Sequence, residues 1–219
     1  MNQEVKPRRR YHSRRRQEQA DQTRRQIITA ASRLFRHQGY GVPMPSIAAE
    51  AGVVVETVYR IFGSKAGLFR AVVGALLAGG PTRAEVPVEQ RPAIRTIINE
   101  PDPRRQVALY AATQPGIHRR SGPLLRALRD AQAGDPELAT LWAELEAWRH
   151  GGQGRFVAQL AQQGALRPDR SQEQAADIVF MLCSLAAHDL LVRERGWTTD
   201  QYESWLTAAL THELLSRRS

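Results

Sequence analysis

The chain has 219 residues, a hydrophobic content of 42% and a net charge of +9. Such a composition supports a proper core and a soluble surface, in one large domain or a small domain joined to a larger one. No run approaches the roughly 18 consecutive apolar residues of a membrane span. No apolar segment follows the N-terminal arginines, so we expect no signal peptide. The single cysteine, Cys183, excludes an intramolecular disulfide and favours a reducing cytoplasm.

The excess positive charge lies in the first third of the chain. Residues 1–70 contain 14 Lys or Arg and 5 Asp or Glu, a net of +9, whereas residues 71–219 contain 17 of each. This division predicts a module that binds a polyanion, joined to a neutral module. A basic tail that only aids solubility is the alternative explanation of the charge.

Residues 1–20 contain PRRR and SRRR without apolar periodicity, which predicts a disordered basic arm. A helical pattern follows it. Apolar residues at helical spacing occur at Ile27, Ala30, Ala31, Leu34 and Phe35. We expect this helix to begin at Asp21 or Thr23 as N-cap and to end at Gly39.

The stretch VVVETVYR, residues 53–60, has the composition of a β-strand. No second strand signal lies nearby to pair with it, and Val54, Val58, Ile61 and Phe62 fall on one side of a helix. We therefore expect a helix from Val54 or Val55, after a short helix that Gly52 ends. A further helix is expected after Ser64 as N-cap. Two short helices joined by a tight turn and braced on both sides make a helix-turn-helix.

The remainder of the chain is predicted to be helical as well. A short helix is expected near residues 93–99. Longer helices are expected at 104–113, 123–133, 136–163, 172–193 and 199–216. The apolar segments 172–193 and 199–216 suggest a four-helix dimer interface; completing a monomer core is the alternative. The interface residues expected are Ile178, Leu182, Leu185, Tyr202, Trp205, Leu206, Ala209 and Leu210.

The strings TRRQIITAASRLFRHQGY, IAAEAGV and ETVYRIFGSKAGLF, within residues 23–69, resemble the TetR/AcrR (tetracycline-repressor-like) family of bacterial transcription regulators. The later string RERGWTTDQYESWL, with the apolar helix before it, looks like one actinobacterial-type branch of that family. The resemblance implies an all-α homodimer with an N-terminal three-helix helix-turn-helix domain and a C-terminal helical ligand-binding and dimerisation domain. The expected division is 1–20 arm, 21–70 DNA-binding domain, 71–219 effector domain.

What the resemblance implies for function is a sequence-specific DNA-binding regulator of the cytoplasm, usually a repressor that a small molecule releases from a near-palindromic operator. The residues expected to contact double-stranded DNA are Thr23, Arg24, Pro45, Val54, Val55, Glu56, Thr57, Tyr59, Arg60 and Lys65. Tyr59 and Lys65 match phosphate-contacting positions of the family. The arginines of the arm are expected to enter a flanking minor groove or to lie along phosphates. They are Arg8, Arg9, Arg10, Arg14, Arg15 and Arg16.

The sequence departs from the family pattern in the DNA-reading region. The loop between Tyr40 and Ile47 is one residue short, and Pro43 stands where a capping Ser or Thr is usual. Val54 replaces a Ser N-cap, and Val55 takes a position that is often Lys or polar. These changes leave the operator sequence unpredictable.

The effector pocket is expected among aromatic residues of the C-terminal domain, and its small-molecule ligand is expected to be hydrophobic or aromatic. The expected lining is Tyr110, His118, Leu125, Trp142, Trp148, His150, Phe156, Phe180 and His188. Plain core packing is the alternative for these aromatics. The alternative for the whole chain is a helical ligand-binding or enzymatic protein whose basic N-terminus does not read DNA.

Signals for enzyme or metal chemistry are incomplete. His212 and Glu213 begin an H-E-x-x-H pattern that lacks its second histidine, and the glycines at 151–154 lack phosphate-loop spacing. His188 with Asp189 forms a polar pair more typical of a hydrogen-bonded core. We expect no enzyme activity, no cofactor and no metal.

Overall fold

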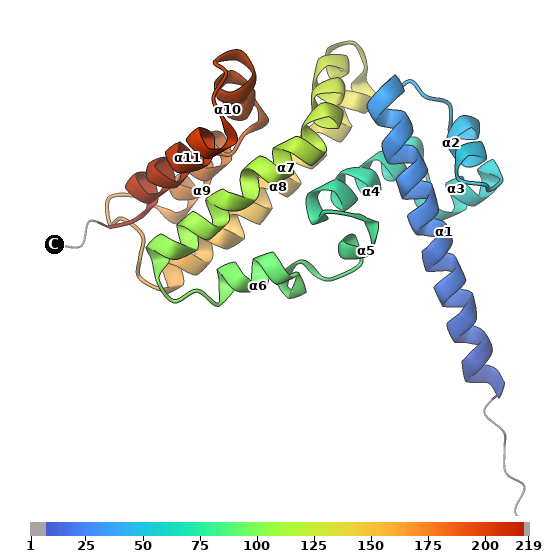
Figure 1. Ribbon diagram of the computed structural model, residues 1–219, viewed down its shortest axis with the longest axis horizontal. Helices are drawn as coiled ribbons and strands as arrows, with labels where there is room; N and C mark the ends of the chain where they lie inside the picture. The colour runs from blue at the N-terminus through green and yellow to red at the C-terminus, as the bar shows by residue number, and fades with distance from the viewer. Residues whose placement is uncertain (1–7, 217–219) are drawn as a thin grey trace, which may run out of the picture. The chain divides into compact units, whose positions relative to one another are not determined.

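The computed structural model describes the backbone of residues 8–216 and the side chains of residues 15–216. Within these ranges every regular element is a helix, as Figure 1 shows. An isolated bridge between extended residues joins Leu166 to Leu215. The predicted all-α class is confirmed. The chain divides into two compact units between Ala75 and Leu76.

The first unit is a small helical domain. Its helices are α1 (Arg8–Gln38), α2 (Met44–Glu50), α3 (Val55–Phe62) and the first part of α4 (Lys65–Ala78). Its core consists of apolar side chains that these helices share. The largest of them, nearly or fully inaccessible to solvent, are Ile27, Phe35, Ile47, Leu68 and Phe69. The apolar spacing read from the sequence thus marks the buried faces of α1, α2 and α4.

Glycine and serine set the helix ends in this unit as predicted. Gly39 ends α1 at φ 70°, a conformation that a residue without Cβ adopts freely, and its N–H donates to the Phe35 carbonyl at 3.0 Å. Ser64 begins α4, because its hydroxyl oxygen accepts a hydrogen bond from the Gly67 N–H at 3.0 Å. Both predicted ends are confirmed.

The prediction of a disordered arm is wrong for residues 8–20, the part of the arm that the structure describes. Helix α1 begins at Arg8 rather than near Asp21, so residues 8–20 are its first turns. The hydroxyl of Thr23 does not cap a helix start but donates to the Gln19 carbonyl at 2.9 Å inside the helix. Arg, Gln, Glu and Ala all have high helix propensity, so the segment extends α1 even without an apolar face.

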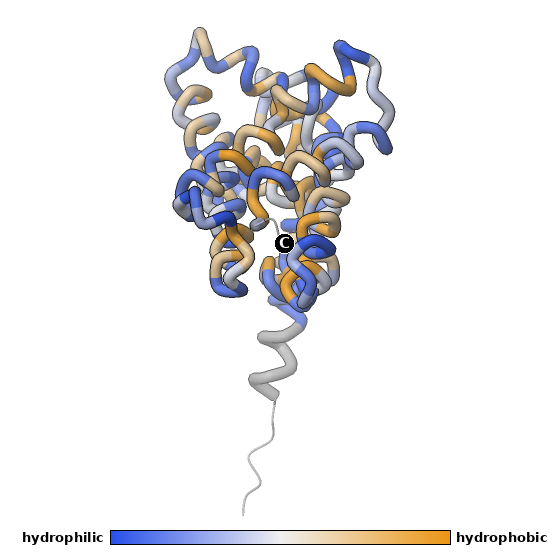
Figure 2. The backbone as a smooth tube through the Cα atoms, turned by 90° about the vertical axis from the view of Figure 1, so that its left-hand side faces the viewer, coloured by the Kyte–Doolittle hydropathy of each residue, from blue (hydrophilic) through white to orange (hydrophobic). Residues whose placement is uncertain are grey.

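The second unit contains the other helices. They are α5 (Pro81–Ala84), η1 (Val88–Gln90), α6 (Pro92–Ile98), α7 (Pro103–Ala131), η2 (Gln132–Gly134), α8 (Pro136–Gln162), α9 (Gln172–Leu182), α10 (Leu185–His188), the π-helical η3 (Asp189–Glu194) and α11 (Thr199–Leu214). Helix α7 packs against α11, and α8 packs against α9. Hydrophobic and hydrophilic stretches alternate along the chain in Figure 2, as expected for helices with one buried face.

Helix α7 is one continuous helix where the sequence predicted two. Pro115 and Pro123 lie inside it, although each removes a helical hydrogen bond and is costly in a helix interior. A buried stripe runs unbroken across both prolines. Its members are Val107, Ala111, Gln114, His118, Ser121, Leu124 and Leu128. Packing along this stripe therefore offsets the local cost of the two prolines.

The expected helix over 172–193 is interrupted instead. Cys183 ends α9, and Ser184 begins α10 by accepting a hydrogen bond from the Ala187 N–H at 3.0 Å. The chain then widens into the π-helical turn η3. A serine that can cap a new helix in mid-segment is the local cause of the interruption.

The predicted dimer stripe on α11 is instead part of the core of the second unit. Tyr202, Leu206 and Leu210 have 0% of their surface exposed within a single chain. Leu182 and Leu185 are buried there as well, whereas Ile178, Trp205 and Ala209 are partly buried against the same core. The fully buried side chains have no surface left to offer a second subunit, because α7 and α9 already cover that face of α11.

Among the described residues, Gln172–Glu194 is the single helical segment with the length and hydropathy of a membrane span. The segment is broken at Cys183 and Ser184, and Val179 in its first half is fully buried in the second unit. A core helix of a globular protein acquires the same composition by being covered on several sides.

Candidate nucleic-acid interface and effector site

Helices α2 and α3 form the helix-turn-helix of the first unit. Gly52 at φ 69° turns the chain after α2, and its neighbour Val53 donates a hydrogen bond to the Ala48 carbonyl at 3.0 Å. Helix α3 begins directly afterwards at Val55, with Val54 as an extended N-cap that has no side-chain cap. The valine-rich stretch is thus a turn followed by a helix, as the helical spacing predicted.

One side of α3 is anchored and the other faces solvent. Val58 has 0% of its surface exposed, whereas Val54 is 65% and Tyr59 46% exposed. Glu56 and Arg60 are exposed too, and Val55 and Thr57 are half-buried at the flanks. A short helix with exposed polar and apolar side chains on one face, placed after a helix-turn, has the form of a recognition helix.

Two of the expected DNA-contacting cations lie over aromatic rings of the same unit. The Lys65 Nζ atom lies 4.8 Å from the centre of the Tyr40 ring, and the guanidinium of Arg24 lies 4.8 Å from the centre of the Phe62 ring. Phe35 and Phe69 pack against Tyr40 and hold it in place. Lys65 is the first residue of α4, where the helix dipole also attracts an anion.

The remaining expected contacts are placed as follows. Pro45 is exposed in the first turn of α2, and Thr23 is half-buried on α1. Arg15 and Arg16 are exposed on α1, so this part of the basic segment is a helix face rather than an extended arm. The side chains of Arg8, Arg9, Arg10 and Arg14 lie outside the described part of the chain.

The expected effector pocket is only partly assembled. Tyr110 of α7 stacks on Phe156 of α8 with ring centres 4.0 Å apart, and His118 of α7 stacks on His188 of α10 at 4.5 Å. His150 contacts Phe180 at 5.3 Å. Trp148, by contrast, is 46% exposed, and Leu125 and Trp142 are half-buried.

Polar groups in the core of the second unit were missed from the sequence. Gln114 and Gln153 are buried, and the Tyr110 hydroxyl is hydrogen-bonded with Gln153. The sequence did contain a signal for these buried polar groups: Gln114 and His118 are four residues apart and so lie on the same, buried face of α7. Six buried side-chain atoms have no hydrogen-bond partner among the described residues, and three of them are His118 Nε2, Gln153 Oε1 and the Tyr202 hydroxyl oxygen. Such groups are costly unless something satisfies them.

Burial also sets the ionisation of this core. Desolvation, reinforced by His188 and by Arg149, lowers the pKa of His118 to about 3. Desolvation lowers the pKa of His188 as well, against the opposing effect of Asp189. The stacked imidazoles are therefore neutral near pH 7 and offer hydrogen bonds rather than charge. Burial raises the pKa of Cys183 to about 12, so its thiol is protonated and unreactive.

In residues 15–216, no group of three or more His, Cys, Asp or Glu side chains is placed so that it could hold a metal ion.

The comparison with known families concerns the first unit above all. Residues 27–72 match the family model of bacterial regulatory proteins of the tetR family. This range contains the C-terminal half of α1, all of α2 and α3, and the first half of α4. No protein of curated function matches the chain in sequence.

Solved structures extend the similarity to most of the chain. A TetR-family regulator from a Rhodococcus species has 16% identity and a TM-score of 0.68, with 89% of this chain and 99% of that one covered. A regulator from Saccharomonospora viridis in complex with choline has 21% identity and a TM-score of 0.60, covering 89% and 98%. The regulator FadR from Bacillus subtilis in complex with stearoyl-CoA has 16% identity and a TM-score of 0.60, covering 84% and 94%.

A helix-turn-helix that matches the family model and a whole-chain fold shared with such regulators define the class. Residues 27–72 thus resemble the tetR family of bacterial regulatory proteins in sequence, and most of the chain shares its fold with solved regulators. The regulators of this family are in general not enzymes.

The position of Lys65 leads to a prediction. Replacing Lys65 by Ala should weaken binding to all DNA sequences alike and lower the slope of log affinity against log salt by about one, because one phosphate contact is lost. Binding to operator and to unrelated DNA is measured by fluorescence anisotropy over a range of salt concentrations. Arg83→Ala, which removes one exposed positive charge from the second unit, is the control and should leave the slope unchanged. A Lys65→Ala protein with altered base preference would contradict a phosphate-contacting role.

Proposed function

We propose that this protein is a cytoplasmic repressor that binds a near-palindromic operator as a homodimer and is released by a small-molecule effector. The observation that carries the proposal is the exposed face of α3, which presents Glu56, Tyr59 and Arg60 with the half-buried Val55 at its flank, while Val58 anchors the helix in the core. Side chains of this kind read base edges and phosphates in a major groove, Val55 by contact with a thymine methyl and Arg60 by pairing with guanine or phosphate.

Glu56 and Arg60 have a second interpretation, because residues four apart on a helix form ion pairs worth about 0.2–0.5 kcal/mol. The net charge of +9 in residues 1–70 favours DNA contact for Arg60. Arg15 and Arg16, exposed on the extended first turns of α1, would add phosphate contacts beside the helix-turn-helix.

The effector is proposed to bind inside the second unit, between α7, α8 and α11. The stack of Tyr110 on Phe156 supplies an apolar wall, and the unpartnered atoms of His118, Gln153 and Tyr202 supply hydrogen-bonding positions. This supports a ligand with an aromatic or apolar body that also carries polar groups, rather than a purely hydrophobic one. Choline and stearoyl-CoA in two proteins of the same fold differ so much that the fold alone does not select the effector.

A route from effector to DNA starts at α7. Arg120, two residues after His118, donates from Nε to the Leu76 carbonyl at 2.8 Å, near the end of α4. Leu76 belongs to the second unit, and helix α4 continues from the first unit into the second. We propose that α4 is the connection through which α7 acts on the helix-turn-helix. A releasing effector must bind the released state more tightly than the DNA-bound state, since equal affinity for both shifts nothing.

The homodimer is proposed to form on the apolar surface that the core leaves uncovered. Met181 on α9 is 56% exposed and Leu190 on η3 is 51% exposed, and Ile178 lies one turn before Met181 on α9. Large apolar side chains exposed in this way are typical of interaction surfaces, and a two-fold interface would bring each patch against its own copy.

The central proposal is tested by a gel shift with the DNA upstream of the protein's own coding region. The wild type should bind it at low salt, and Arg60→Glu should weaken binding about five- to 150-fold, because a loss of about 1–3 kcal/mol is typical of a base-reading arginine. Arg83→Glu on the second unit is the matched control and should bind like the wild type.

Effectors are found by screening metabolites and drugs for thermal stabilisation and repeating the gel shift with each hit. Folded protein that fails to bind any such DNA would favour the alternative of a helical ligand-binding protein. Hits that stabilise the protein and leave DNA affinity unaltered would refute ligand-controlled release.

The proposed dimer surface makes a separate prediction. Met181→Glu places a charge in the apolar patch and should shift the protein from dimer towards monomer at micromolar concentration, measured by analytical ultracentrifugation. Gln162→Glu, at an exposed position at the end of α8, is the control and should remain dimeric. A fully dimeric Met181→Glu protein would place the interface elsewhere.

A further inference from the structure

Lys65 lies over an aromatic ring whose position is fixed by the core of the first unit. Its Nζ atom is 4.8 Å from the centre of the Tyr40 ring, within the roughly 6 Å at which the face of a ring attracts an ammonium group. Tyr40 comes two residues after the end of α1, and Lys65 is the first residue of α4. The contact therefore joins the end of one helix to the start of another.

Two core phenylalanines hold the Tyr40 ring in place. The ring stacks nearly parallel to Phe35 with ring centres 6.0 Å apart, and it meets Phe69 edge to face at 5.4 Å. Phe35 and Phe69 contact each other at 5.1 Å, and each has 1% of its surface exposed. Tyr40 itself is only half-buried, so part of its surface stays available to a cation. The ring is thus a rigid support for the Lys65 side chain.

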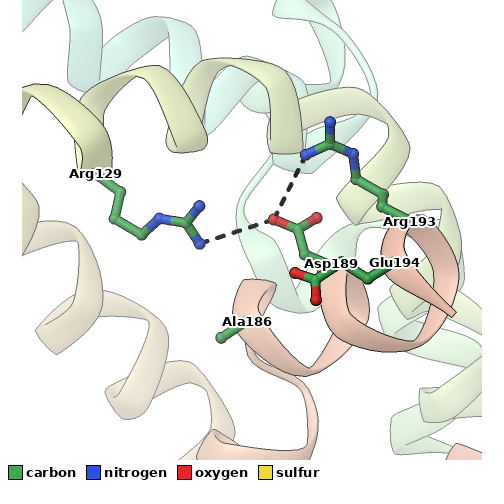
Figure 3. A pocket seen from close by; sticks show the side chains of 5 residues that line it. All are labelled: Arg129, Ala186, Asp189, Arg193 and Glu194. Atoms are coloured by element: carbon green, nitrogen blue, oxygen red, sulfur yellow. Dashed lines mark ion pairs between the residues drawn. The ribbon is translucent and has the colours of Figure 1, made fainter.

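An aromatic ring holds a cation without cancelling its charge, which a carboxylate cannot do. In the second unit, Arg129 and Arg193 reach the Asp189 carboxylate from opposite sides (Figure 3). Those guanidinium groups are held in place, but the carboxylate offsets their charge. The Tyr40 ring is uncharged and attracts the Lys65 ammonium through its quadrupole. It therefore fixes the position of Lys65 and leaves the positive charge for an anion.

A lysine that is already in position loses less freedom when it binds. Its four-carbon stem is flexible in water, and ordering such a side chain at an interface weakens binding by about two- to tenfold. Lys65 is half-buried and lies over a fixed ring, so most of this ordering is complete before DNA arrives. The ring lowers the cost of the phosphate contact as long as Lys65 keeps its place over Tyr40 in the complex.

We propose that Tyr40 is a positioning residue for DNA binding, which holds Lys65 so that its ammonium group meets a backbone phosphate at the start of α4. Tyr40 acts through Lys65 and not through a DNA contact of its own, and the sequence analysis did not include it among the contacting residues. The inference rests on the proposed DNA-binding function. It adds a residue of the hydrophobic core to the determinants of DNA affinity.

Substitutions of Tyr40 separate the ring from its hydroxyl group. Tyr40→Leu removes the ring but keeps an apolar side chain against Phe35 and Phe69. It should weaken binding to the DNA upstream of the protein's own coding region about two- to tenfold, measured by fluorescence anisotropy at fixed salt. The slope of log affinity against log salt should stay at the wild-type value, because the Lys65 charge is still present. Tyr40→Phe keeps the ring and should bind like the wild type.

A double-mutant cycle tests whether Tyr40 acts through Lys65. In a Lys65→Ala protein, Tyr40→Leu should cause no further loss of DNA affinity, because no ammonium group remains to be held. Arg70→Ala removes an exposed positive charge from the same helix and is the matched background, in which Tyr40→Leu should keep its full effect. A purely structural role of Tyr40 would instead weaken DNA binding equally in both backgrounds.

Thermal melting of each variant sets an assay temperature at which all are folded. Tyr40→Met, also apolar and without a ring, replaces Tyr40→Leu if that variant does not fold. The proposal is overturned if the ring-free variant binds DNA as tightly as the wild type or more tightly, if Tyr40→Phe is equally weak, or if the loss persists in the Lys65→Ala protein. Folded wild-type protein that binds no DNA overturns the proposed function as well, whereas the other results overturn this inference alone.

Discussion

Val58 determines which side of α3 is available for function. Of the eight described residues of this helix, it alone is buried, with 0% of its surface exposed in the core of the first unit. Burying a valine contributes about 1.5–3 kcal/mol and fixes the rotation of a helix that is too short to be stable by itself. The opposite face is then necessarily exposed, and it carries Glu56, Tyr59 and Arg60. The set of α3 side chains that face solvent therefore depends on the apolar contact that Val58 makes on the opposite side of the helix.

The second unit depends in a similar way on the buried stripe of α7. This stripe continues past Pro115 and Pro123 and covers α11, so that Tyr202, Leu206 and Leu210 become core residues. The same stripe carries Gln114 and His118, and this mixture of apolar and polar positions is the basis on which we propose an effector site there. Purely apolar packing would be more stable, because each buried polar group without a partner costs about 1–3 kcal/mol.

The helices of the first unit could be predicted because local signals and packing agree there. Apolar spacing marked the face of α1, Gly39 and Ser64 marked helix ends, and the absence of a partner strand ruled out a strand at Val53. The residues expected to contact DNA lie on α1, α2, α3 and α4 of one unit, and those of α3 that face solvent follow from its period.

Predictions failed where a long-range contact decided the outcome. Apolar periodicity shows that a face is buried but not what covers it, so the α11 stripe was assigned to a partner subunit when α7 covers it. The sequence predicted separate helices at 104–113 and 123–133, yet a buried stripe that runs past Pro115 and Pro123 keeps α7 continuous. The gathering of Arg129, Asp189 and Arg193 arises from α7 meeting η3. Arg129 and Asp189 are sixty residues apart, so their spacing in the sequence does not predict that contact.

Whether α3 reads DNA sequence as part of a two-fold dimer is tested most directly by selecting binding sites from random double-stranded DNA. The wild-type protein should enrich a near-palindromic sequence, and Glu56→Gln should change the preferred bases at symmetric positions in both half-sites while leaving their spacing unchanged. Symmetric change follows because each subunit presents the same α3 to its own half-site. Enrichment of no sequence by folded wild-type protein, or an identical preference for a Glu56→Gln, Arg60→Ala double variant, would contradict a recognition role for α3.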